Sequence, residues 1–229
     1  MKRINQISFD VWLTLLKSNP EFKLRKVELL KEKYNPEGLS FAEINDIMRN
    51  VDVQSTRVAE ITERNFDPKS MIAMILIRMN NSKVVKPVID KIHDEFQQLY
   101  LENLPFLYDE NTKPVLEELN DLGLSLNVAS NTGFIVGESV REALTQLGIY
   151  KYFDFGIFSD ECGFAKPSSN FFSKVQSTGE YYTENILHVG DNEYADGFGA
   201  ESFGIRSMII NSNNKSIKDV LTLIKQTNE

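Results

Sequence analysis

The sequence has 229 residues, 41% of them hydrophobic and 25% charged, and its 25 basic and 33 acidic residues give a net charge of −8. This length and composition are typical of a globular chain with one full domain and a smaller one, and the acidity argues against non-specific binding to nucleic acid or to a membrane surface. A lone cysteine, Cys162, excludes an intramolecular disulfide, and the N-terminal stretch has no signal-peptide core, so we expect a cytoplasmic protein.

A short β-branched and aromatic run at residues 7–9 predicts a first strand that ends at Asp10, with Trp12 and Thr14 just beyond it. An acid at the carboxyl end of the first strand of an open α/β sheet lies where such sheets bind their ligands. Asp10 is therefore a candidate catalytic or ligand-binding residue. Asp is also common at helix starts, so this stretch alone leaves open that Asp10 is only a cap or turn residue.

The next block, residues 20–103, shows helical periodicity and no alternating strand pattern. It predicts helices over about 21–33, 40–63, 67–79 and 84–102, the second of them opened by a capping box at Ser40 and Glu43. Its most apolar run, residues 71–77, is too short to cross a bilayer. Because the block follows Asp10 and Thr14, it would overhang the carboxyl edge of the sheet, where a lid belongs.

From residue 104 onward the predicted strands, at residues 124–129, 153–158, 185–189 and 206–210, alternate with helices. This alternation indicates βαβ units and a parallel sheet. We therefore predict an α/β fold, a three-layer Rossmann-like parallel sheet. Residues 1–16 and 104–229 would form this core, and residues 17–103 would form an inserted α-helical cap domain.

Polar residues follow four of the predicted strands: Asp10, Ser130, Lys166 in the 159–167 loop, and Asp191. The carboxyl ends of parallel strands meet at one edge, so we expect these groups to converge. Two carboxylates would repel each other unless a cation lay between them, and such hard oxygen ligands suit Mg²⁺. The amine and the hydroxyl would suit an anion such as phosphate, which a carboxylate can attack to form an aspartyl-phosphate.

The four segments resemble the motifs of the haloacid dehalogenase (HAD) superfamily. Residues 10–14 resemble its first motif, Asp-x-Asp-x-Thr, and residues 128–131 resemble the second, a strand ending in Ser or Thr. Lys166-Pro167 resembles the third, and Gly190-Asp191 with Asp196 five residues further on resembles the fourth. The resemblance covers nearly the whole chain, and the helical insert stands where the family's α-helical cap belongs.

The resemblance implies a Mg²⁺-dependent phosphatase that acts on a small phosphorylated metabolite. Asp10 would be the nucleophile and a metal ligand, with the backbone carbonyl of Trp12 and the side chain of Asp191 as further ligands. Asp196 would hold a metal-bound water or orient Lys166. The phosphate would be bound by side chains and backbone N–H groups of Val11, Trp12, Ser130, Asn131 and Lys166.

One position departs from the family pattern. Phosphatases of the family carry a second Asp two residues after the nucleophile, where this chain has Trp12, and an indole cannot transfer the proton. Glu193 is a candidate replacement acid. Three alternatives stay open: a phosphatase, a metal-independent dehalogenase-like hydrolase, whose members carry an aromatic residue here, and a catalytically impaired phosphate-binding regulatory protein. The sequence does not distinguish a monomer from a homodimer.

Overall fold

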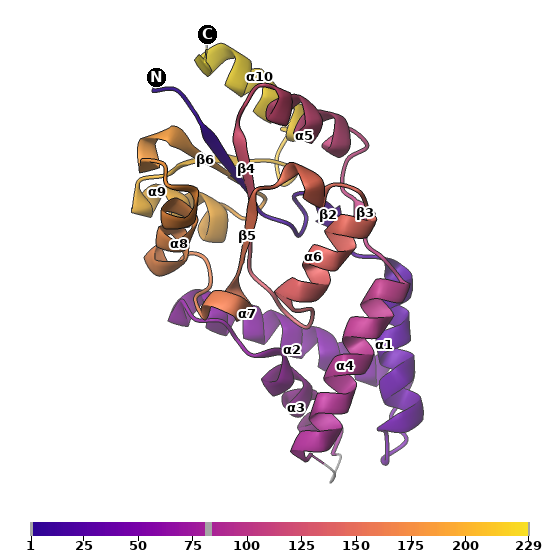
Figure 1. Ribbon diagram of the computed structural model, residues 1–229. Coiled ribbons are helices and arrows are strands. Elements are labelled where there is room, and N and C mark those ends of the chain that lie inside the picture. The colour runs from indigo at the N-terminus through magenta and orange to yellow at the C-terminus, as the bar shows by residue number, and fades with distance from the viewer. Residues whose placement is uncertain (1, 81–83, 229) are drawn as a thin grey trace.

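The computed structural model describes residues 2–80 and 84–228 and is built around a five-stranded parallel sheet in the order β5-β4-β1-β6-β7 (Figure 1). Its strands are β1 (Gln6–Phe9), β4 (Ser125–Ser130), β5 (Phe155–Phe158), β6 (Ile186–Gly190) and β7 (Arg206–Ile209). β1 lies at the centre, with Phe9 opposite Val128 of β4 on one side and Val189 of β6 on the other. The predicted α/β fold with a Rossmann-like parallel sheet is confirmed.

Helices cover both faces of this sheet. Ile7 and Phe9 of β1 belong to a core cluster with side chains of α5 (Thr112–Asp121), α6 (Gly137–Gln146) and α10 (Ile217–Asn228). The opposite face packs on α8 (Ser169–Gly179) and α9 (Gly199–Phe203). Strand side chains alternate between faces, so β4, β5 and β6 contribute to the cores on both sides of the sheet, and the three predicted layers follow.

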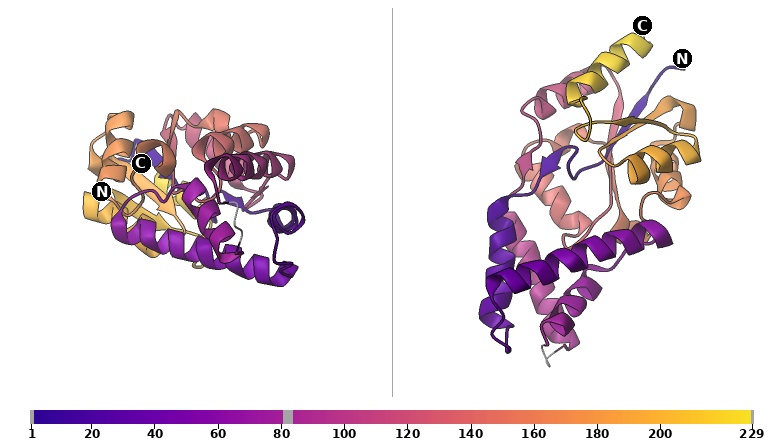
Figure 2. Two further views of the ribbon diagram at one scale, coloured as in Figure 1. Left: turned by 90° about the horizontal axis from the view of Figure 1, so that it is seen from below. Right: turned by 180° about the vertical axis from the view of Figure 1, so that it is seen from behind.

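Four helices follow the first strand: α1 (Pro20–Lys33), α2 (Phe41–Thr62), α3 (Pro68–Arg78) and α4 (Lys86–Glu102). They gather at one end of the molecule (Figures 1 and 2). They share their own hydrophobic cluster, which Phe134 joins from the sheet domain. The predicted Ser40–Glu43 capping box is present. Among residues 2–80 and 84–228, no helix combines the length and hydropathy needed to cross a membrane.

The two linkers between the sheet and the four helices pair with each other as a short antiparallel ribbon, β2 (Leu16–Lys17) with β3 (Phe106–Leu107). Strands of two residues carry no periodicity, so the sequence did not predict this ribbon. The predicted domain division, at 16/17 and 103/104, falls within or beside the ribbon, and these boundaries stay a prediction.

Two further segments differ from the predicted elements. The loop expected over residues 159–167 begins with a short helix, α7 (Ser159–Cys162). The Gly- and Ala-rich residues 196–202 predict a helix, which starts earlier as a π-helical turn, Glu193–Phe198. In the π-helical turn, the Asn192 side chain accepts hydrogen bonds from the backbone N–H groups of Tyr194 and Ala195. Such side-chain capping explains an early start that apolar periodicity does not reveal.

We expect Leu126→Ala to lower the free energy of unfolding by about 2–5 kcal/mol, because Leu126 is fully buried in β4 and its truncation leaves a cavity in the sheet core. The matched control is Leu122→Ala, at a side chain that is 47% exposed, which should cost less than about 0.5 kcal/mol. Urea unfolding followed by circular dichroism measures both, and equal losses would contradict this packing.

Candidate active site

The candidate site lies at the carboxyl edge of the sheet, where β1, β4 and β6 end side by side. Asp10 directly follows β1, Ser130 is the last residue of β4, and Asp191 directly follows β6. The parallel register, with Phe9 aligned to Val128 and Val189, brings these three positions to one edge. The expected convergence of the strand ends is therefore observed.

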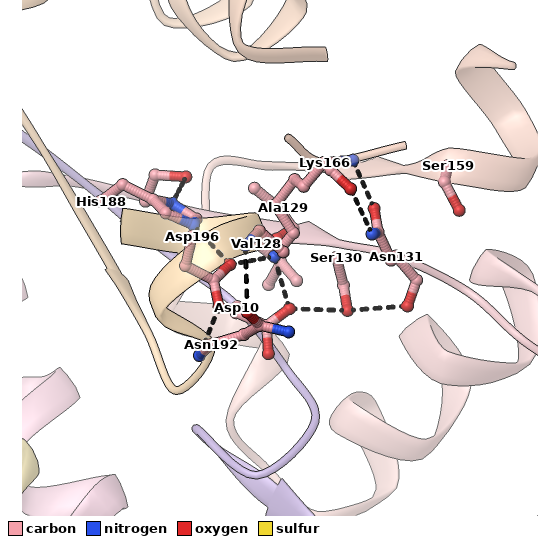
Figure 3. A network of polar contacts seen from close by, with 12 residues as sticks. Asp10, Val128, Ala129, Ser130, Asn131, Ser159, Lys166, His188, Asn192 and Asp196 are labelled. Carbon is pink, nitrogen blue, oxygen red and sulfur yellow. Dashed lines mark hydrogen bonds and ion pairs between the residues drawn. The ribbon is translucent and has the colours of Figure 1, made fainter. Parts of the chain in front are cut away.

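Lys166 binds two carboxylates at the centre of the site (Figure 3). Its Nζ lies 2.6 Å from Asp10 Oδ1, 2.6 Å from Asp196 Oδ1 and 2.9 Å from the carbonyl oxygen of Ala129. All three ammonium hydrogens thus have an acceptor. The three charged side chains are 2–8% exposed, so this is a buried ion cluster rather than a surface salt bridge.

Ser130 and Asn131 complete the surroundings of this cluster. Ser130 Oγ donates a hydrogen bond of 3.1 Å to Asp10 Oδ1. The Asn131 side chain holds the backbone of Lys166 at both ends, donating to its carbonyl at 3.0 Å and accepting from its N–H at 2.8 Å. Asn131 therefore fixes the loop that carries the lysine, while Ser130 fixes one oxygen of Asp10.

A row of polar side chains continues from Asp196 across the buried face of the sheet. His188 Nε2 lies 3.0 Å from Asp196 Oδ1, and His188 Nδ1 lies 3.1 Å from the hydroxyl of Ser8. Asn127 donates to that hydroxyl at 3.1 Å and accepts from Gln6 at 2.7 Å. Because a carboxylate can only accept, Nε2 carries the proton toward Asp196. His188 is thus a strand histidine with both ring nitrogens hydrogen-bonded.

Oxygens of Asp10, Asp191 and Asp196 lie within 4.8 Å of one another. Burial raises the pKa of Asp10 more than the charge of Lys166 lowers it. Burial is also the main reason that the pKa of Asp191 is raised to about 7, and the negative charges of Asp10 and Asp196 add to this shift. Burial also acts on Asp196, but Lys166 and His188 outweigh it and hold that pKa below its usual value. Three crowded carboxylates beside one lysine fit a divalent cation with hard oxygen ligands.

An open cleft of about 430 Å³ leads from these carboxylates to the helical insert. Trp12 lines this cleft and packs edge-on against Tyr100 of α4, with ring centroids 6.0 Å apart. Glu193, the predicted replacement acid, is exposed and is not among the residues that line the cleft. The insert instead supplies Asp52 and Glu60 to the cleft, and the Glu60 carboxylate accepts a hydrogen bond of 3.3 Å from Asn192.

Some of these residues could be found from the sequence, and others could not. Gly190, in the fourth motif, is buried where any Cβ would collide with the Asp196 carboxyl group, so the glycine itself marks a close approach. No comparable feature of the sequence identifies the residues that the insert supplies to the cleft, Lys26, Asp52 and Glu60. They lie on amphipathic helices whose orientation over the sheet is set by tertiary packing, which periodicity alone does not reveal.

A family model for haloacid dehalogenase-like hydrolases matches residues 33–210. The glyceraldehyde 3-phosphate phosphatase of Methanothermobacter thermautotrophicus is 33% identical over 104 residues, which is 44% of each chain. A Pseudomonas fluorescens (S)-2-haloacid dehalogenase is 24% identical over 222 residues, 96% of this chain and 90% of that protein. The chain spans about half the length of other curated relatives, such as 49% of the mouse haloacid dehalogenase-like hydrolase domain-containing protein 3.

The fold has close counterparts among solved structures. The HAD-hydrolase YfnB from Bacillus subtilis, bound to magnesium, superimposes with a TM-score of 0.76 at 17% identity, over 98% of this chain and all of that one. A HAD phosphatase from Thermococcus onnurineus gives a TM-score of 0.70 at 19% identity, with 98% of each chain covered. The chain belongs to the haloacid dehalogenase-like hydrolase family, and its helical insert stands in the position of the family's cap.

We expect Lys166→Met to lower the free energy of unfolding by about 3–5 kcal/mol in metal-free buffer, because it leaves the buried carboxylates of Asp10 and Asp196 without their counter-charge. The double variant with Asp196→Asn should lose clearly less than the sum of the two single variants, since it removes a carboxylate together with the amine. Chemical unfolding of all four proteins measures this coupling. Additive losses would show that the two side chains do not interact.

Proposed function

We propose that this protein is a Mg²⁺-dependent phosphatase that acts on a small phosphate ester through an aspartyl-phosphate at Asp10. The observation that supports this most strongly is the crowding of Asp10, Asp191 and Asp196 within 4.8 Å around a buried lysine. Without a cation, the repulsion between three carboxylates so close together would be offset by Lys166 alone and would destabilise the fold.

The donor set fits a magnesium ion. Asp10, Asp191 and the backbone carbonyl of Trp12 would hold it, with Asp196 close enough to bind a water of its shell. A bound Mg²⁺ would supply positive charge where negative charge gathers on the phosphoryl oxygens. We further propose Val11, Asn131 and the backbone of Trp12 as phosphate contacts, and residues 17–103 as the cap that closes over the ester.

Asp10 is arranged to act as a nucleophile. Its Oδ1 accepts hydrogen bonds from Lys166 and Ser130, and among the described residues no donor contacts Oδ2. Oδ2 is therefore the atom available to attack phosphorus. A bond from Oδ2 to phosphorus forms as the ester P–O bond breaks, and the ester oxygen leaves with the electron pair. Water then attacks the phosphorus of the aspartyl-phosphate, which releases inorganic phosphate and restores the carboxylate.

Trp12 determines which esters react well. The leaving oxygen needs a proton when its alcohol is a weak acid, and Trp12 cannot supply one from the position next to the nucleophile. We therefore expect esters with a good leaving group to react fastest. The indole leaves the proposed metal site intact, because that site uses only the backbone carbonyl of Trp12.

Trp12 also supports a second candidate, hydrolysis of a carbon–halogen bond through an aspartyl ester at Asp10 without a metal. An aromatic residue at this position and the alignment along nearly the whole length of a (S)-2-haloacid dehalogenase favour it. The cluster of Asp191 and Asp196 with Asp10 weighs against it, because without a cation only Lys166 would offset the repulsion of three close carboxylates.

We expect the protein to release phosphate from p-nitrophenyl phosphate in the presence of Mg²⁺, and chelation by EDTA to abolish this activity. Asp10→Asn should reduce turnover by about 10³-fold or more, because the amide is not a nucleophile. Asp191→Asn should shift the activity to higher Mg²⁺ concentration. Phosphate release and thermal unfolding with and without Mg²⁺ measure these effects.

Two outcomes would contradict the phosphatase. Chloride release from 2-chloropropionate that is indifferent to EDTA would identify the dehalogenase alternative. Phosphate binding with no turnover of any ester would identify a catalytically impaired regulatory protein.

We expect Trp12→Asp to raise turnover of esters with poor leaving groups by about 10²-fold, because it restores a proton donor beside Asp10. Turnover of p-nitrophenyl phosphate, whose leaving group needs no proton, should change little. Trp12→Asn is the matched control, since it has the same size as Trp12→Asp but cannot transfer a proton. Equal rates for the two variants on glycerol 3-phosphate would show that proton transfer at this position is not limiting.

A further inference from the structure

Two lysines of α1, Lys23 and Lys26, line the cap side of the cleft that holds Asp10. They are three residues apart and so lie on one face of the helix. Lys23 is exposed, but Lys26 is only 9% exposed. A lysine nine-tenths buried is uncommon, because its charge is taken from water, and it normally has a carboxylate partner.

Lys26 has no such partner. Among residues 2–80 and 84–228, no carboxylate forms an ion pair with its Nζ and no acceptor receives a hydrogen bond from it. Its surroundings are aromatic instead, with Nζ 4.5 Å from the ring centroid of Phe22, 4.7 Å from that of Phe134 and 5.7 Å from that of Phe96. These rings stabilise a cation but leave its hydrogen-bonding capacity unused.

Lys26 keeps its charge without forming an ion pair to any described residue. Burial lowers the pKa of Lys26 to about 8, Asp52 opposes that shift and Lys23 adds to it, so the amine is protonated at neutral pH. Asp52 reaches the same cleft, where burial raises the pKa of its carboxyl group despite the two lysines. Asp52 is the carboxylate whose charge acts on Lys26. Among the described residues, neither lysine forms an ion pair with Asp52 or with Glu60, the other carboxylate that the insert supplies to the cleft.

We propose that Lys26, assisted by Lys23, binds a second anionic group of the substrate, a carboxylate or a second phosphate, while the ester phosphate lies at Asp10. This rests on the proposed phosphatase function and narrows its substrate to compact esters with two anionic ends. The aromatic rings beside Lys26 exclude water and so strengthen its attraction for an anion. A cleft of about 430 Å³ suits a small metabolite rather than a polymer.

The test compares substrates that differ only at the far end. Wild type should hydrolyse 3-phosphoglycerate and glycerol 1,3-bisphosphate with a higher kcat/KM than glycerol 3-phosphate, which has a neutral group in place of the second anion. Lys26→Met should lower kcat/KM for the two anionic esters by about 10-fold to 100-fold and leave glycerol 3-phosphate within about twofold. Whichever of the two anionic esters loses more kcat/KM in Lys26→Met carries the anionic group that Lys26 prefers, a carboxylate or a phosphate.

The controls separate this inference from the function on which it rests. Lys31→Met makes the same change at an exposed lysine of α1 and should alter no substrate. Lys26→Met should keep the thermal stability of wild type, since methionine fits among aromatic rings. Equal losses on all three esters, or no preference in wild type while p-nitrophenyl phosphate is hydrolysed, would overturn the anion site alone. No hydrolysis of any ester would overturn the phosphatase and the anion site together.

Discussion

The buried contact between the Lys166 ammonium and the carboxylates of Asp10 and Asp196 is the interaction on which the rest of the site depends. The three groups come from segments that follow β5, β1 and β6, so the contact forms only when the sheet is complete. Without the ammonium, two carboxylates would be buried side by side at a cost of several kcal/mol. The fold and the proposed chemistry are thus coupled, because the same lysine stabilises the sheet edge and neutralises the proposed nucleophile, Asp10.

This contact is supported by polar residues on a sheet face that would ordinarily be apolar. Ser8 and His188 lie on neighbouring strands and pair with each other, and His188 donates to Asp196. A hydrogen-bonded row in a low-dielectric interior is rigid when its members are satisfied. It holds Asp196 in one orientation, and Asp196 in turn positions Lys166. The positions of Asp196 and Lys166 are therefore fixed in part by hydrogen bonds inside the sheet, away from its carboxyl edge.

The sequence was informative where local pattern and chain topology together determine position. The alternation of strands and helices predicted the parallel sheet, and a parallel sheet requires that residues such as Asp10, Ser130 and Asp191 meet at one edge. The helices of the insert were also predictable from periodicity. Their placement was not, since it depends on packing between elements and on the two-residue ribbon. Residues that reach the cleft from the insert, such as Lys26, were therefore missed.

Trp12 connects the sheet edge to the helical insert. Its ring packs against Tyr100 of α4, Tyr100 packs against Phe22 of α1 with centroids 5.4 Å apart, and Phe22 carries the ammonium of Lys26 above its ring. The residue that replaces the expected acid is thus the first of a series of contacts that ends at the proposed anion site. An aspartate at this position would lose the aromatic contact with Tyr100 of the helical insert. In the proposed phosphatase, the residue that disfavours esters with poor leaving groups would also position the helices that carry Lys26, and so would set the spacing between Asp10 and the proposed anion site.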